Sequence, residues 1–195
     1  MKVYNHRVNT ISALNKVKSS HGAEIDLRTR LGDLILAHDP YAKGELFSKW
    51  LKHWRGQSLI INVKEDALEE SILDLLARNG VSDYFFLDQS YPSVRRSVSL
   101  GITQIATRVS DYEALETALN SGSEWVWLDC FSGIWDYLPE AVTSINKNGQ
   151  NTCLVSPELQ RVDSAEELIL LQSIIQKNRL TIDAVCTKLP ESWES

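Results

Sequence analysis

Two acidic side chains, Glu24 and Asp26, are separated by one residue within an apolar run typical of a buried strand. Side chains alternate between the two faces of a strand, so both carboxylates face one way, opposite Ala23, Ile25 and Leu27. Buried together, the carboxylates repel, and either one takes up a proton or both require a cation. A divalent metal meets that requirement, and oxygen ligands of this kind suit Mg²⁺ or Ca²⁺ better than Zn²⁺.

Further polar residues stand where other apolar runs end. Asn62 would add a neutral oxygen ligand if it faces the same axis as the acids. Arg7 and Lys64 supply positive charge for a phosphate. His6 and His38 are the nearby side chains able to exchange protons near neutral pH. Together these residues predict phosphate chemistry beside a divalent cation.

Ion pairing offers a simpler explanation of the acids. Glu24 and Asp26 could pair with Arg28, Arg7 or Lys64, and each pair taken alone favours that role. The positions of the whole set favour a site instead, because all lie near the carboxyl ends of the first predicted strands, where barrel enzymes carry their active sites.

Other polar and aromatic residues have weaker claims to function. A solvated or ion-paired loop role is the simpler interpretation of four charged residues that follow later strands: Asp88, Arg108, Asp129 and Lys188. Trp127 is expected in the core, and His21 and His53 are expected to face water.

The elements that position these residues alternate between two periods. Strands are predicted at residues 3–6, 23–29 (with an extension at 34–38), 58–64, 84–88, 102–109, 125–130, 152–156 and 183–187. Helices are predicted at residues 10–20, 44–54, 67–79, from about 92, 111–121, 135–148 and 164–178. Eight strand-then-helix units predict parallel strands and fit closure into a compact (β/α)8 TIM barrel, a single domain over residues 1–195. Each unit averages roughly 24 residues, against about 30 in the usual barrel, so the loops must be short.

Glycines and capping residues punctuate this pattern. Four glycines just past helical runs suit left-handed helix ends: Gly80, Gly101, Gly122 and Gly149. Asp111 and Ser164 stand where helix N-caps belong, and the segment from Ser164 to Glu167 resembles a capping box. Gly32 and Asp33 fit a tight turn between two extended pieces.

Composition narrows the classes of function. The chain is 43% hydrophobic and 24% charged with a net charge of −6, which argues against non-specific binding to nucleic acid or to anionic membranes. The three cysteines are expected to be buried, reduced thiols. The N-terminus has no apolar signal segment, and no run approaches the roughly 18 apolar residues of a membrane span, so we expect a cytoplasmic protein without an integral membrane segment. Oligomeric state stays open.

The opening of the chain resembles that of the glycerophosphodiester phosphodiesterases, in the superfamily of the phosphatidylinositol-phospholipase-C-like phosphodiesterases. The resemblance covers residues 5–40: a His6-Arg7 pair, Asn9-Thr10 at the first helix, Glu24-x-Asp26 on a strand, and a His38-Asp39 pair at matching intervals. Asn62-Val63-Lys64 is similar to the family's next motif, an acid-x-Lys. The rest of the chain is similar to the family in its alternation of strands and helices and not in sequence motifs.

The resemblance implies a role for each matching residue. His6 and His38 would be the acid–base pair, and Arg7 and Lys64 would bind the phosphate and stabilise developing negative charge. Glu24 and Asp26, with Asn62, would hold one Mg²⁺ or Ca²⁺. A hydroxyl of a small phosphodiester substrate would attack phosphorus, forming a cyclic phosphate that water then opens.

Three departures from the family pattern bear on these roles. Val8 replaces a glycine, which predicts an altered phosphate end of the pocket. Asn62 replaces a carboxylate, which predicts weaker metal binding. Residues 40–44 leave no room for a covering insertion, which predicts a pocket that is open or is closed by a partner subunit.

These departures keep two alternatives open. The chain could be a catalytically impaired barrel that binds a phosphate or sugar ligand or a protein. It could also be a lyase that releases a cyclic phosphate.

Overall fold

Eight parallel strands form the wall of a closed barrel. The computed structural model describes residues 1–161 and 164–194. The wall consists, in order, of β1 (Lys2–Asn5), β2 (Gly22–Arg30), β5 (Leu59–Val63), β6 (Tyr84–Leu87), β7 (Ala106–Val109), β8 (Trp125–Leu128), β9 (Asn151–Val155) and β10 (Ala184–Thr187). Strand β10 pairs with β1, which closes the ring, and a bridge between Phe86 and Ile105 joins β6 to β7. The predicted TIM barrel is confirmed.

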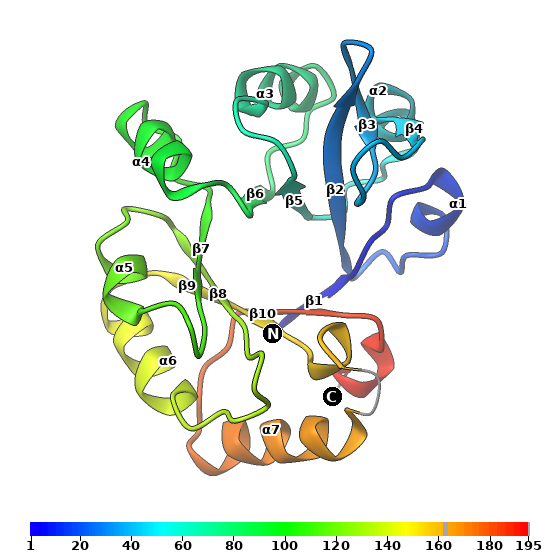
Figure 1. Cartoon of the computed structure of the whole chain (residues 1–195). Helices are drawn as coiled ribbons and strands as arrows, with labels where there is room; N and C mark the ends of the chain where they lie inside the picture. The colour runs from blue at the N-terminus through cyan, green and yellow to red at the C-terminus, as the bar shows by residue number, and fades with distance from the viewer. Residues whose placement is uncertain (162–163, 195) are drawn as a thin grey trace.

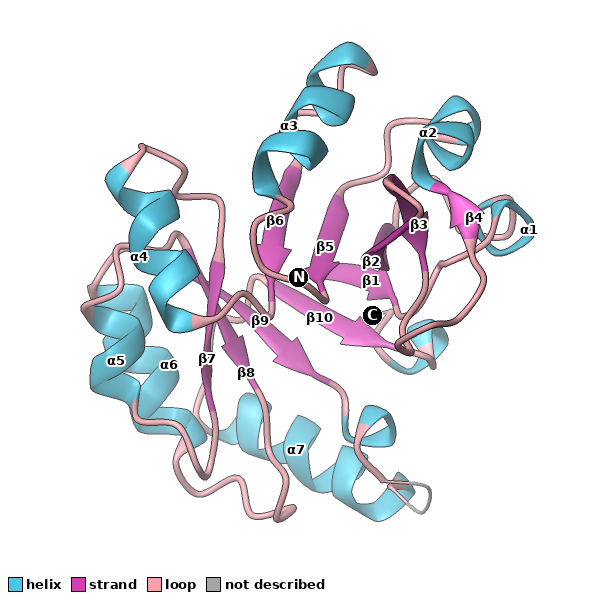
Figure 2. Cartoon of the chain, turned by 45° about the horizontal axis from the view of Figure 1, so that its top comes forward, coloured by secondary structure: helices cyan, strands magenta, loops and turns pink. Residues whose placement is uncertain are grey.

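Helices surround this wall (Figures 1 and 2). They are α1 (Ile11–Leu14), α2 (Phe47–Trp50), α3 (Glu69–Arg78), α4 (Tyr91–Ser99), α5 (Leu115–Leu119), α6 (Leu138–Lys147) and α7 (Ala165–Lys177), with 3₁₀ turns η1 (Leu51–His53), η2 (Pro157–Leu159) and η3 (Pro190–Ser192). Among the described residues, no helix has the length and apolar character needed to span a membrane.

Side chains inside the barrel follow the period-two alternation of the strands. The inner apolar layer contains Tyr4, Ile60, Phe85, Trp127 and other residues from all the wall strands except β2. On β2 the corresponding inward positions are those of Glu24 and Asp26, because the register pairs Glu24 with Ile60 and Asp26 with Asn62. The barrel interior therefore holds a polar patch on β2 and β5 beside this apolar layer.

The segment after β2 differs from the predicted extension and helix. Strand β3 (Asp33–Leu36) runs antiparallel to β2, and the short β4 (Glu45–Leu46) pairs with β3. Leu31 and Gly32, with φ of 52° and 88°, make the hairpin turn one residue earlier than predicted. Only α2 and η1 of the predicted helix over 44–54 are helical, because Glu45 and Leu46 are used in the sheet.

Two predicted helices are shorter than expected. After Leu14 the chain tightens into bonds from residue i to i−3, such as Val17 N to Leu14 O at 3.1 Å, so α1 ends early. Helix α5 begins at Leu115 because Asp111 is not its cap: the Asp111 carboxylate accepts bonds from the backbone N–H groups of Phe131 and Ser132 at 3.0 and 2.8 Å.

Two other local predictions were wrong and two were confirmed. The Ser164 side chain makes no capping bond, so the predicted capping box is absent. His21 is buried, with its Nε2 2.9 Å from Glu194 Oε1, instead of facing water. The four glycines predicted at helix ends have φ between 69° and 82°, and all three cysteines are buried and free.

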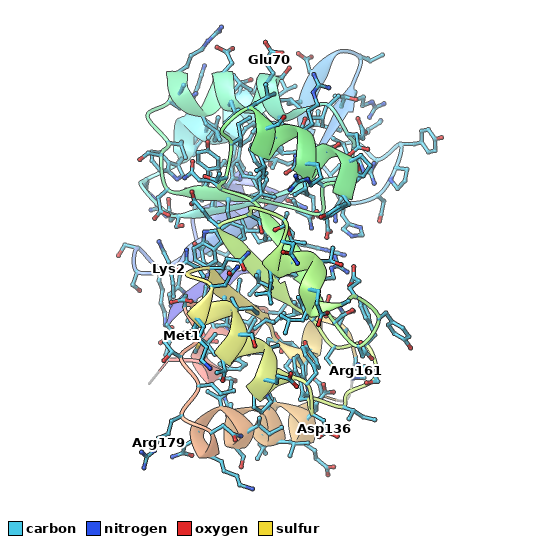
Figure 3. The ribbon with its side chains drawn as sticks, turned by 90° about the vertical axis from the view of Figure 1, so that its left-hand side faces the viewer. Met1, Lys2, Glu70, Asp136, Arg161 and Arg179 are labelled. Carbon is cyan, nitrogen blue, oxygen red and sulfur yellow. The ribbon has the colours of Figure 1, made fainter. Side chains whose placement is uncertain are left out.

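Segments that precede the wall strands lie at one end of the barrel, and segments that follow them lie at the other end. Met1, Lys2 and Arg179, which lie before or at the start of wall strands, are on one side of the view in Figure 3, and Asp136 and Arg161, in segments that follow wall strands, are on the opposite side. The carboxyl ends of the parallel strands thus share one rim.

Candidate active site

The two carboxylates of β2 are fully buried and held by short hydrogen bonds. The backbone N–H of Arg7 donates to Glu24 Oε2 at 2.7 Å. Asn9 donates from Nδ2 to Asp26 Oδ2 at 2.7 Å, and its Oδ1 accepts from the Asp26 backbone N–H at 2.8 Å. The turn after β1 therefore fixes both acids.

Three buried oxygens in this patch have no hydrogen-bond partner: Glu24 Oε1, Asp26 Oδ1 and Asn62 Oδ1. Buried polar atoms are normally satisfied, so each such group calls for an explanation. The three oxygens come from paired positions on β2 and β5, and carboxylate and amide oxygens are the ligands of Mg²⁺ and Ca²⁺. The donor set thus fits a hard divalent cation. Only two of its members are acids, and no group of three or more His, Cys, Asp or Glu side chains suited to a metal occurs in the described chain.

Burial changes the protonation of Glu24. Burial, together with the neighbouring Asp26 carboxylate, raises the pKa of Glu24 to about 8, against the lowering effect of the Arg7 backbone hydrogen bond. Without a cation, Glu24 is therefore protonated at neutral pH. A bound cation would favour the carboxylate form.

His6 lies against these acids as a neutral imidazole. Its Nε2 is 3.9 Å from Glu24 Oε2, and its buried Nδ1 has no hydrogen-bond partner. Burial lowers the pKa of His6 to about 3, and the nearby positive charges of Arg7 and Lys188 lower it further. A neutral ring with an unused nitrogen can accept a proton.

His38 has a different environment. Its Nδ1 lies 2.7 Å from Asp39 Oδ1, and its backbone carbonyl accepts a bond from Arg28 Nε at 3.0 Å. The His38 side chain is 38% exposed, so the ring reaches solvent at the rim. The carboxylate orients the ring and can balance the charge of an imidazolium.

Two cations border the acids. Arg7 is exposed and has a left-handed backbone, with φ of 57°, a conformation that costs energy in a residue with a side chain. Lys64 Nζ lies 3.3 Å from Asp26 Oδ1 as an ion pair and 3.3 Å from Asp88 Oδ2. The simpler interpretation of Asp26, ion pairing to Lys64, thus describes part of the arrangement.

Most of the predicted site residues line one cavity of about 250 Å³ at the barrel mouth. They are His6, Arg7, Glu24, His38, Asn62 and Lys64. Asp26 is not in the lining but lies behind it, fully buried. Val8 is also outside the lining and packs in the core between sheet and helices. The Val8 side chain therefore does not contact the cavity, so any effect on the phosphate end of the pocket would be indirect.

The structure adds an ion-pair chain to the same cavity. Arg108 pairs with Asp88, and its Nη1 lies 3.6 Å from Asp129 Oδ2. Gln160 donates to both carboxylate oxygens of Asp129 at 2.8 and 3.0 Å. Burial raises the pKa of Asp129, whereas Arg108 and Lys64 lower the pKa of Asp88 despite its burial.

Sequence reasoning underestimated these residues. Asp88, Arg108 and Asp129 are ion-paired as expected, but with one another inside the site cavity, while Lys188 is outside its lining. The motif Asn9-Thr10 by itself predicts only the start of a helix for Asn9. The signal for Arg108 was its inward parity on β7, two residues after the inward-facing Ala106.

Comparisons with known proteins bear on the fold. No protein-family model matches the sequence, and no curated protein matches it either. Solved structures do. A glycerophosphodiester phosphodiesterase from Agrobacterium tumefaciens str. C58 has a TM-score of 0.75 at 14% identity, with 98% of each chain covered.

Two further solved structures give the same result. The Thermotoga maritima glycerophosphodiester phosphodiesterase has a TM-score of 0.73 at 14% identity, covering 98% of this chain and 96% of that one. One from Parabacteroides distasonis ATCC 8503 has a TM-score of 0.71 at 17% identity, covering 97% and 93%. At such low identity these likenesses show that the chain shares the barrel fold of these proteins.

Proposed function

We propose that the protein is a metal-dependent phosphodiesterase acting on a small phosphodiester that carries a free hydroxyl near the phosphate. One observation carries the proposal: two histidines, two cations and the oxygens of Glu24 and Asn62 line a single cavity, with Asp26 directly behind it. The similarity in fold to glycerophosphodiester phosphodiesterases supports this reaction class.

Each histidine has one step of the reaction. His6, neutral and with an unused nitrogen, accepts the proton of the attacking hydroxyl as its oxygen bonds to phosphorus. His38, oriented by Asp39, donates a proton to the oxygen of the departing alcohol as the old phosphorus–oxygen bond breaks. The products are a cyclic phosphate and an alcohol.

Arg7 and Lys64 hold the phosphate between the histidines. Both are at the cavity, and Lys64 is fixed by Asp26 and Asp88, so its ammonium is positioned before substrate binds. Glu24 and Asn62, through oxygens without a hydrogen-bond partner, and Asp26, through the Oδ1 atom that Lys64 also contacts, would hold Mg²⁺ or Ca²⁺. A cation there would neutralise charge on the phosphoryl oxygens.

The cyclic phosphate has two fates. Water opens it to a phosphomonoester if His38 then acts as base and His6 as acid, which makes the protein a hydrolase. Release before water attacks would make it a lyase, with the same first step.

A binding function without catalysis is the second candidate. It is favoured by Asn62 in place of an acid and by the Lys64–Asp26 ion pair, which already supplies a positive charge beside the acids. Calorimetric titration of chelator-treated protein with Mg²⁺ and Ca²⁺ separates the two functions. Binding that is lost in Glu24→Gln/Asp26→Asn supports the metal enzyme, and no binding at millimolar metal supports the second candidate.

Activity tests the proposal itself. Purified protein is incubated with glycerophosphoethanolamine and either divalent metal or chelator, and release of ethanolamine, the departing alcohol, is measured. Loss of either histidine by His6→Ala or His38→Ala should lower kcat about 100-fold or more, the usual contribution of acid–base catalysis. His53→Ala, an exposed histidine outside the cavity, is the matched control and should retain activity. Equal activity in all three variants would contradict the assigned roles.

A further inference from the structure

The barrel wall has a weak seam between β6 and β7. One bridge, Phe86 to Ile105, joins these strands, whereas each other neighbouring pair in the wall shares two or more register positions. Toward the amino end, the Gln104 side chain spans the seam by donating to the carbonyls of Ser82 and Tyr84, both at 3.3 Å. Toward the carboxyl end, no ladder pair of the described chain joins Leu87 to β7, so the strands separate where the candidate site lies.

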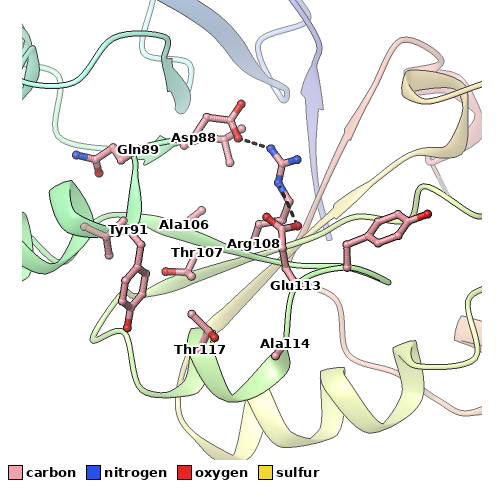
Figure 4. A pocket seen from close by; sticks show the side chains of 12 residues that line it. Asp88, Gln89, Tyr91, Ala106, Thr107, Arg108, Glu113, Ala114 and Thr117 are labelled. Atoms are coloured by element: carbon pink, nitrogen blue, oxygen red, sulfur yellow. Dashed lines mark hydrogen bonds and ion pairs between the residues drawn. The ribbon is translucent and has the colours of Figure 1, made fainter.

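A cavity of about 580 Å³ fills this separation; we call it the seam cavity. Its volume falls within the range of small-molecule sites, roughly 300–1,000 Å³. Asp88, Gln89 and Tyr91 line one side, and Arg108, Glu113 and Thr117 line the other (Figure 4). Leu87, Asp88 and Arg108 also line the cavity of the candidate site, so the two spaces adjoin across these residues.

Backbone geometry at the boundary is unusual. Asp88 has φ of 62°, a left-handed conformation without glycine. Such outliers persist where surrounding contacts hold them, and they cluster at functional sites. Here Lys64 and Arg108 both contact the Asp88 carboxylate, which faces the boundary of the two cavities.

The charged residues of the seam cavity restrict the charge of a ligand that could bind there. Its charged residues are two acids and one base, and Arg108 pairs with Asp88 and lies 4.0 Å from Glu113. An anion would meet both carboxylates, and a cation would compete with Arg108 for them. Uncharged hydroxyl groups suit the set, since they donate to Asp88 and Glu113 and accept from Arg108. The half-exposed Tyr91 ring adds a flat apolar wall.

We infer that the seam cavity binds the departing alcohol of the substrate and that this alcohol is an uncharged polyol. This inference rests on the proposed function. The phosphate must lie between Arg7 and Lys64 in the candidate site, so that the alcohol extends past Arg108 into the seam cavity. Arg108 is then a specificity residue at the boundary, positioned by Asp88 and Asp129.

Filling the seam cavity tests the inference. Thr117 lines it from an exposed position on α5, so Thr117→Trp blocks it with little effect on the core. Glu116→Trp adds the same side chain one residue away on α5, outside the lining, and is the matched control. Ala114→Leu is a second, smaller blocking variant, used if Thr117→Trp lowers the melting temperature. The substrates are glycerophosphoinositol, glycerophosphocholine and glycerophosphomethanol, which has almost no alcohol arm.

The readout is kcat/KM for each diester relative to glycerophosphomethanol. We expect Thr117→Trp to lower this ratio for glycerophosphoinositol about tenfold, as expected when several hydroxyl contacts are excluded, and Glu116→Trp to leave it unchanged. An unchanged ratio in a folded Thr117→Trp protein would overturn the inference. A larger loss for glycerophosphocholine would overturn the polyol assignment.

Binding distinguishes failure of this inference from failure of the proposed function. If the unmodified protein hydrolyses none of the diesters, the proposed function fails, and calorimetric binding of glycerophosphoinositol becomes the readout. Binding that Thr117→Trp abolishes and Glu116→Trp preserves supports the seam cavity as a polyol site. No binding to the unmodified protein overturns it.

Discussion

Glu24 links the chemistry of the site to the stability of the fold. Its pKa is raised from 4.5 to about 8, so between these values the folded protein keeps a proton that the unfolded chain loses. The stability that Glu24 contributes is therefore fully present below pH 4.5 and is lost as pH rises toward 8. His6 does not interfere above about pH 7, because its folded pKa of about 3 lies below the ordinary value and it is neutral in both states.

The expected result concerns metal-free protein. The melting temperature of chelator-treated protein should fall from about pH 7 to about pH 8 and level off above it, and Glu24→Gln should flatten this decline, because the amide resembles the protonated acid. Thermal unfolding followed by circular dichroism measures both. A parallel decline in the variant would show that Glu24 is not the titrating group.

Asn9 should control metal affinity without contacting the metal. Its two hydrogen bonds to Asp26, at 2.7 and 2.8 Å, fix the orientation of that carboxylate. Loss of such supporting bonds usually weakens metal binding by about 10- to 100-fold, and we expect this of Asn9→Ala in a calorimetric titration. Asn15→Ala, at the end of α1, is the control. Equal affinity in both variants would argue against a metal ligand at Asp26.

The sequence correctly predicted which side chains share the site where their direction follows from the alternation of side chains along a strand. Glu24, Asp26 and Asn62 share a face because their strands are neighbours in register. Asn9 could not be assigned, since its partner is 17 residues away and the contact depends on how the loop after β1 folds. The inward parity of Arg108 indicates the barrel interior, but its pairing with Asp88, 20 residues away, depends on how the rim folds.

The turn of the β2–β3 hairpin places Leu31 in a backbone conformation that is unfavourable for leucine. Leu31 has φ of 52° and is 96% exposed, so it bears the cost of a left-handed backbone without burying its side chain. Asparagine is favoured at such positions in two-residue hairpins. Leu31→Asn should raise the free energy of unfolding by about 1 kcal/mol, measured by urea denaturation. Leu100→Asn, an exposed leucine with φ of −92°, should give no gain. An equal gain in Leu100→Asn would show that the stabilisation comes from removing an exposed apolar side chain and not from the turn conformation.

Predictions of elements succeeded where periodicity was strong and failed at their ends. The wall strands and helices α3 and α7 lie within two residues of the predicted ranges, apart from the start of β7. Strand β7 begins at Ala106, not at residue 102, because the preceding residues form the seam. Helix α5 was mispredicted because the Asp111 carboxylate bonds to a loop that follows β8, a contact no local pattern shows.

At the scale of the molecule, barrel closure assembles the site. The candidate cavity takes residues from β2, β5, the rim after β1 and β3, and the later half of the barrel. Parallel strands bring their carboxyl ends to one rim, so residues from 6 to 160 meet in a cavity of about 250 Å³. The number of units predicted this closure, whereas the opening of the β6–β7 seam depends on pairing that the sequence does not show.

A phosphorus NMR time course of a glycerophosphodiester with the protein and a divalent metal follows cleavage of the phosphodiester bond itself. We expect the diester signal to be replaced by that of a cyclic phosphate or a monoester. Chelator, His6→Ala and His38→Ala should each stop the change, and His53→Ala should not. An unchanged diester signal with metal-loaded, folded protein, for polyol and simple alcohols alike, would contradict the proposed function.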